Sequence, residues 1–181
     1  VRKDLLYAGT ELGVYLSFDG GKNWQPFQLN LPVTPITDLR VHKGDLIAAT
    51  SGRSFWVLDE IHVLRQYNKE QTGLQLYKPE EAYIANGYSA MNAANPTGTA
   101  RGAGVNPANG VVLYYNLPDL KATDTVTMTI ADANGTVIRR FSSVAESAAY
   151  YDGAPPANPT LSKQKGLNRF VWDMRFATMP G

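Results

Sequence analysis

The sequence contains no cysteine, only two histidines and almost no net charge. Without cysteine the chain has no disulfide, no cysteine-bound zinc and no thiol nucleophile. His42 and His62 have no second ligand at metal-binding spacing, so we expect no metal site. A net charge of +1 without a cluster of Lys and Arg argues against nucleic acid as a partner.

Long apolar runs are absent as well. No stretch approaches the roughly 20 residues of a membrane helix, so we expect no membrane insertion. The glycine-rich segment GTARGAGVNPANG, residues 98–110, lacks the Gly-Lys-Ser/Thr of a phosphate-binding loop and has no strand and helix around it. We therefore expect no cofactor. With 44% hydrophobic residues in 181, the chain is nevertheless able to bury a substantial core.

The first third of the chain consists of short strand-forming segments separated by turn residues, with no helical periodicity. LLYAGTELGVYLS (5–17) and DLIAATSGRSFWVL (45–58) align loosely, with Ala8-Gly9-Thr10 opposite Ala48-Ala49-Thr50. A period of about 40 residues with several strands per unit is typical of propeller blades. We expect strands at 5–11, 13–18, 23–27, 35–42, 45–51 and 54–58.

The rest of the chain divides into a connecting region and a second β-rich region. The connection, 64–110, begins as a short helix or irregular segment, and 18 of the 25 residues from 86 to 110 are Ala, Gly, Asn or Pro, a linker composition. In 111–181, strands are expected at 111–117, 125–130, 137–141 and 168–176, with Asp132 to Gly135 as a hairpin turn. In the last strand Phe170, Trp172, Met174 and Phe176 would form one aromatic-rich face.

The segment SFDGGKNW, Ser17 to Trp24, has a structural explanation for each of its distinctive residues. The Asp19 carboxylate and the Ser17 hydroxyl are suited to accept hydrogen bonds from turn amides. Gly21 allows positive φ, and Trp24 is placed to cover the turn with its ring.

This segment resembles the Asp-box, or BNR repeat, whose pattern is Ser-any-Asp-any-Gly-any-Thr-Trp. Ser17, Asp19, Gly21 and Trp24 match, and Asn23 replaces the usual Thr. Nearly the whole chain is similar to the C-terminal part of large bacterial sortilin-like BNR propeller proteins labelled as glycosyl hydrolases. The resemblance implies an all-β chain: 1–63 would be one to two propeller blades, and 111–181 an incomplete antiparallel Ig-like β-sandwich. It also implies a periplasmic or extracellular location.

On that basis the chain is expected to be a structural segment that closes a propeller and attaches an accessory sandwich, without activity of its own. Because the chain opens VRKDLLYAGT without Met and closes FATMPG soon after a strand, we expect a fragment of a larger protein. Its main partner would then be the rest of the parent propeller.

Two alternatives remain open. The sandwich is the binding module for polysaccharide or a cell-surface protein if Tyr114, Tyr115 and Trp172, with the pair Tyr150 and Tyr151, form an exposed stacking platform. The parent is an active glycosidase if Glu11 or Asp59 faces a second carboxylate within about 10 Å across a cleft. Asp59 and Glu60 cannot form that pair on an extended strand, because neighbouring side chains point to opposite faces.

Overall fold

The computed structural model describes residues 2–83, 108–145 and 158–176 of the chain. It divides into two compact units, Val1–Lys69 and Glu70–Gly181. Both are built from small antiparallel sheets, and one short helix lies in the first unit. The expectation of an all-β chain is confirmed.

The first unit contains two three-stranded antiparallel sheets in the orders β1-β2-β3 and β4-β5-β6. All six strands lie where the sequence predicts them, with shorter ends: β1 (Leu6–Thr10), β2 (Gly13–Ser17), β3 (Gln25–Pro26), β4 (Ile36–His42), β5 (Asp45–Thr50) and β6 (Phe55–Leu58). The predicted strand 23–27 is thus reduced to two residues.

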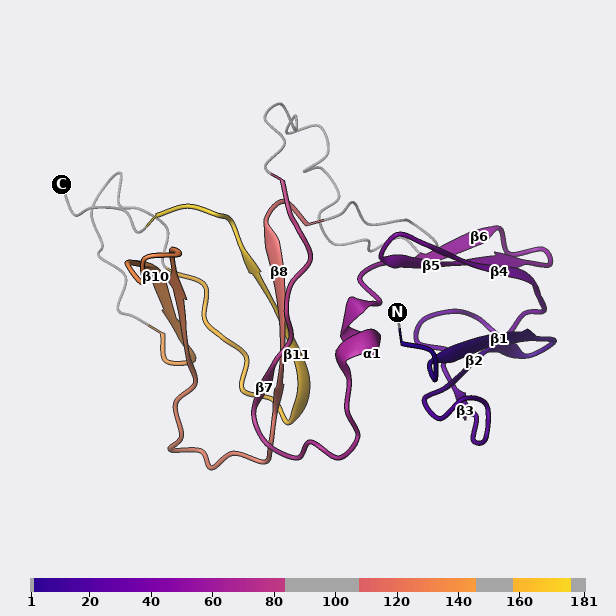
Figure 1. The fold of residues 1–181 in the computed structure, drawn as a ribbon, viewed down its shortest axis with the longest axis horizontal. Helices are drawn as coiled ribbons and strands as arrows, with labels where there is room; N and C mark the ends of the chain where they lie inside the picture. The colour runs from indigo at the N-terminus through magenta and orange to yellow at the C-terminus, as the bar shows by residue number, and fades with distance from the viewer. Residues whose placement is uncertain (1, 84–107, 146–157, 177–181) are drawn as a thin grey trace. The chain divides into compact units, whose positions relative to one another are not determined.

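The two sheets of the first unit lie one over the other as two layers (Figure 1). Their shared core contains Val14 from β2, Leu46 and Ala48 from β5, and Ile61, which follows β6. Gly9 in β1 lies so close to Ile36 in β4 that a Cβ there would come within 2.6 Å of Cγ2 of the isoleucine. A side chain at position 9 would therefore push the sheets apart.

Each sheet of the first unit contains one copy of the sequence repeat as a hairpin. The β1–β2 hairpin pairs Ala8 with Tyr15, and the β5–β6 hairpin pairs Ala48 with Trp56. The aligned alanines therefore hold the same position in the two hairpins. The two segments that are similar in sequence therefore also form similar antiparallel hairpins.

Helix α1 (His62–Gln66) follows β6, in the region where the sequence left a short helix or an irregular segment open. The Arg2 guanidinium donates hydrogen bonds to the carbonyls of Leu64 and Tyr67, which ties the start of the described chain to the end of this helix. None of the helical segments among residues 2–83, 108–145 and 158–176 has the length and apolar character needed to cross a membrane.

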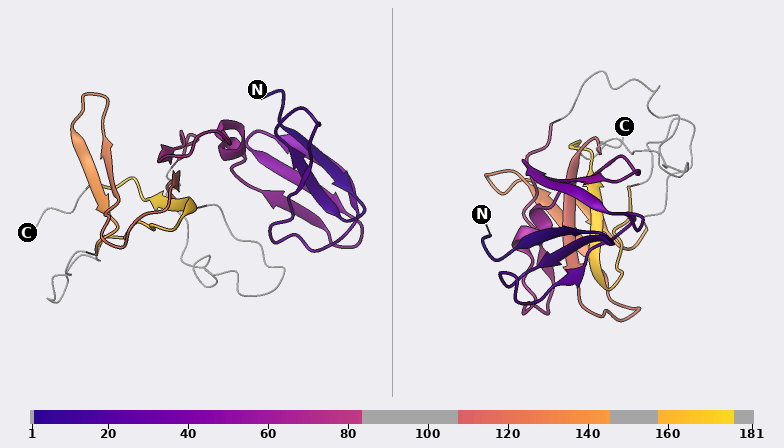
Figure 2. Two further views of the ribbon diagram at one scale, coloured as in Figure 1. Left: turned by 90° about the horizontal axis from the view of Figure 1, so that it is seen from below. Right: turned by 90° about the vertical axis from the view of Figure 1, so that its right-hand side faces the viewer.

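The second unit contains a three-stranded sheet in the order β11-β8-β7 and a β9–β10 hairpin (Figure 2). Its strands are β7 (Gln75–Leu76), β8 (Val111–Leu117), β9 (Thr127–Ala131), β10 (Val137–Ser142) and β11 (Gly166–Trp172). β7 falls within the expected connection 64–110, yet it pairs with β8. Part of that connection therefore contributes to the second unit.

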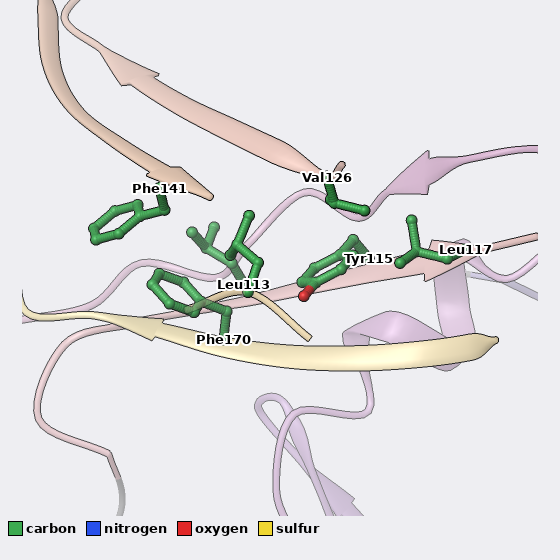
Figure 3. Close-up of a cluster of buried hydrophobic side chains, with 7 residues drawn as sticks. Leu113, Tyr115, Leu117, Val126, Phe141 and Phe170 are labelled. Atoms are coloured by element: carbon green, nitrogen blue, oxygen red, sulfur yellow. The ribbon is translucent and has the colours of Figure 1, made fainter. Parts of the chain in front are cut away.

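The core of the second unit lies between these two groups of strands. Phe141 of β10 and Phe170 of β11 have ring centroids 4.7 Å apart, and Leu113 and Tyr115 of β8 join them (Figure 3). The hairpin closes as predicted: Gly135 has φ 86°, and its amide donates to the Asp132 carbonyl at 3.0 Å.

The last strand is the clearest difference from the sequence prediction. β11 ends at Trp172, and Met174 has a positive φ of 56°, which interrupts an extended chain. Phe176 is 73% exposed and lies outside the strand. The expectation that Phe170, Trp172, Met174 and Phe176 form one strand face is therefore wrong beyond Trp172.

Candidate functional site

Ser17 is the last residue of β2 and begins the Asp-box turn, which leads to β3. Its side chain is 1% exposed. Its hydroxyl donates to Oδ1 of Asp19 at 2.7 Å and accepts the amides of Gly21 at 2.9 Å and Asp19 at 3.3 Å. One donor bond and two acceptor bonds use the full capacity of a hydroxyl, so Ser17 has no lone pair or proton left for a substrate.

Asp19 is also bonded within the turn. Oδ1 accepts the Asn23 amide at 2.9 Å, and Oδ2 accepts the Asn23 side-chain amide at 2.6 Å. These bonds from Asn23, with the one from Ser17, lower the pKa of Asp19 from its ordinary 3.8 to about 2. A carboxylate held ionised in this way is a poor general acid near neutral pH. Asn23, read in the sequence only as a replacement for Thr, supplies two of the bonds.

The pKa of Asp19 predicts how its contribution to stability varies with pH. Because the pKa is lower in the folded chain, the stabilisation is fully present above about pH 4 and is lost as the pH falls toward 2. We expect the free energy of unfolding, measured with urea, to fall more steeply over that window in the wild type than in Asp19→Asn. The variant has no carboxylate at position 19. Parallel pH dependences in the two proteins would contradict the assignment. The Asp4 carboxyl is present in both proteins; its pKa is lowered mainly by its hydrogen bond from Arg2 and is raised to a smaller extent by the Asp19 charge.

The glycines and the tryptophan complete the turn. Gly20 and Gly21 have φ of 72° and 93°, a region that side chains rarely adopt. The Gly20 amide donates to the Asp4 carbonyl at 2.9 Å, which ties the turn to the segment before β1. The Trp24 ring lies beside Gly21, with Cζ2 3.6 Å from where a Cβ would be, yet 44% of its surface is exposed. Trp24 therefore covers the turn only on one side.

Glu11 lies in the tight turn between β1 and β2 and is exposed. It borders an open, apolar hollow on the outer face of the first sheet, whose other lining residues are Ala8, Thr10, Leu12, Tyr15 and Trp24. None of these carries a carboxyl group. The hollow therefore lacks the second acid that a glycosidase pair requires.

Asp59 directly follows β6 and is exposed, in the second sheet of the first unit. Glu11 and Asp59 thus belong to turns of different sheets. The next acidic residue, Glu60, has a φ of 64°, and its amide donates to Oδ1 of Asp45 at 3.4 Å. In this segment an aspartate stabilises the end of a strand, and Asp59 does not line the hollow that Glu11 borders.

Three of the candidates for carbohydrate stacking, Tyr114, Tyr115 and Trp172, do not form a platform. Tyr115 is 3% exposed, and its hydroxyl donates to the Ser162 carbonyl at 2.7 Å. Burial raises the pKa of Tyr115 above its ordinary value. Trp172 packs against the same core, whereas Tyr114 is the next residue of β8 and points to the opposite face. Stacking by the three rings on one surface is thus incompatible with this strand.

Neither histidine lies in a group of metal-ligating residues. No cluster of three or more His, Cys, Asp or Glu side chains occurs in the part of the chain that the structure describes. His62 is 7% exposed and belongs to the start of α1, and His42 lies at the exposed end of β4. The Tyr150–Tyr151 pair and residues 98–107 of the glycine-rich segment lie outside the described residues.

The fold and the site together define an all-β chain with an Asp-containing turn. Comparison with known protein families, with curated proteins and with solved structures gave no match.

Proposed function

We propose that this chain is a structural segment of an exported β-propeller protein similar to the bacterial BNR-repeat family. Its first unit corresponds to the last blades of the ring, and its second unit to an Ig-like accessory sandwich. The rest of the propeller is its principal partner. The location is periplasmic or extracellular, as in that family.

The hydrogen bonds of the Asp-box turn carry this proposal. The Ser17 hydroxyl and the Asp19 carboxylate bond to backbone and side-chain groups between residues 17 and 23. Groups retained for catalysis are commonly held at some cost to stability, whereas these groups satisfy one another. The arrangement of two similar antiparallel hairpins in two packed sheets supports a repeated, blade-like architecture.

A hydrolysis assay combined with thermal unfolding tests the proposal. We expect the purified chain to release no product from a panel of glycans. Asp19→Ala should lower Tm, since it leaves the Asn23 amide and the Ser17 hydroxyl without their partner. Glu11→Gln, a change at an exposed turn position, should leave Tm nearly unchanged and serves as the matched control.

The opposite pattern would contradict the proposal. Glycan turnover by the wild type that disappears in Glu11→Gln or Asp19→Ala, with Tm unchanged, would identify a catalytic carboxylate in this chain. Turnover that survives both substitutions would exclude these two residues but would still be incompatible with a purely structural segment.

A further inference from the structure

Both outer surfaces of the first unit carry exposed apolar side chains. On the first sheet, the hollow lined by Ala8, Leu12, Tyr15 and Trp24 opens away from the core; we call it the first outer face. On the second sheet, Phe55 and Val57 of β6 are 73% and 55% exposed; we call their side the second outer face. Exposed apolar groups gathered in this way indicate an interaction surface.

The sequence repeat shows what each outer face corresponds to inside the unit. Aligning Ala8 with Ala48 through the two hairpin registers places Val14 opposite Phe55, and Leu16 opposite Val57. Val14 and Leu16 are 3% and 1% exposed. In this alignment, the second outer face therefore corresponds to the surface of the first sheet that is buried in the core of the unit.

The same alignment applies in the other direction. Tyr15 aligns with Trp56, and Ala8 with Ala48, which is 5% exposed. Within the unit, Val14 packs in one core with Leu46, Ala48 and Trp56. The residues that align with Leu46, Ala48 and Trp56 are Leu6, Ala8 and Tyr15, and these would be the contacts of Phe55. In the same alignment, the first outer face thus corresponds to the surface of the second sheet against which Val14 packs.

This second contact cannot form within one first unit, because the two outer faces lie on opposite sides of the two stacked sheets (Figure 1). It can form between two copies. Charge does not decide this contact: Glu11 borders the first outer face, and the second carries Arg40 opposite Ile47 but also Asp38 opposite Ala49.

We infer that Phe55 of one copy of this chain enters the hollow of Ala8, Tyr15 and Trp24 on a second copy. The inference rests on the repeat that the proposed function also uses. Association is head-to-tail, so it leaves one free face of each kind at the ends and continues into larger oligomers or a ring. β1 lies at a sheet edge without a strand equivalent to β4 beside it, so the contact is smaller than the one inside the unit and its affinity is low.

Sedimentation of the full chain over a wide concentration range tests the association. We expect the average mass of the wild type to rise with concentration. Phe55→Lys should raise the dissociation constant about tenfold or more, because it places a charge at the centre of the contact. Phe176→Lys is the matched control: Phe176 is also 73% exposed but lies in the second unit, so its substitution should change nothing.

Cross-linking tests the direction of the contact, and the lack of native cysteine makes the result unambiguous. Leu12→Cys and Phe55→Cys variants are mixed and treated with a short bifunctional maleimide. We expect a product that joins one chain of each kind, and little product from either variant alone. A product from Phe55→Cys alone would show like faces in contact and would overturn the head-to-tail arrangement.

A wild type that stays monomeric at every concentration would overturn the association. That result is separable from a failure of the proposed function, which is decided by glycan turnover in the hydrolysis assay. An inactive, monomeric chain would therefore refute only the contact between copies.

Discussion

Tyr115→Ala should destabilise the chain by about 3–5 kcal/mol, as is usual for removal of a buried aromatic ring. Tyr115 is 3% exposed and lies in the core with Leu113 and Phe170 (Figure 3). Urea unfolding followed by far-UV circular dichroism measures the loss. Because the ring is surrounded by other side chains, little of the cavity is expected to collapse.

Two further variants separate the ring from its hydroxyl and from its neighbour. Tyr115→Phe keeps the ring but leaves the Ser162 carbonyl without its hydrogen bond, at a cost of about 1 kcal/mol. Tyr114→Ala alters the half-buried neighbour on the other face of β8 and should cost less than Tyr115→Ala. If Tyr115→Ala instead left stability intact and abolished binding to a polysaccharide, Tyr115 would be a ligand-stacking residue.

Ser17→Ala should destabilise the first unit by about 1–3 kcal/mol, because it removes the acceptor for two turn amides. These are the amides of Gly21 and Asp19, at 2.9 Å and 3.3 Å. The methyl group of alanine fits the space, so the loss reflects hydrogen bonding rather than packing. Urea unfolding with an unchanged denaturant dependence would show that stability alone has changed.

Ser51→Ala provides the control for the change from serine to alanine. Ser51 is exposed in the turn between β5 and β6, and its substitution is expected to alter stability by less than about 0.5 kcal/mol. Equal stability of Ser17→Ala and Ser51→Ala would mean that the hydroxyl at position 17 contributes nothing to the turn. The structural explanation of the Asp-box would then be lost.

The sequence by itself determined most of the strands, their hairpins and the chemistry of their turns, but not β7 or the end of β11. Alternating apolar residues and Gly-Asp-Asn turn signals act over a few residues, so β5, β6, β8 and the turn from Asp132 to Gly135 were all predictable. Ser17 and Asp19 were recognisable as turn residues for the same reason. The two bonds of Asn23 to Asp19 were not expected, because the motif pattern alone does not show where an amide side chain points.

Only the tertiary structure decided which face of each strand is buried. Tyr114 and Tyr115 look alike in sequence, yet only Tyr115 lies on the face of β8 that packs against Phe141 of β10, and Tyr114 lies on the opposite face. Val14 and Phe55 hold equivalent positions in two similar hairpins, but only Val14 has a sheet packed against it. Burial depends on contacts between segments far apart in the chain, and local sequence patterns do not contain that information.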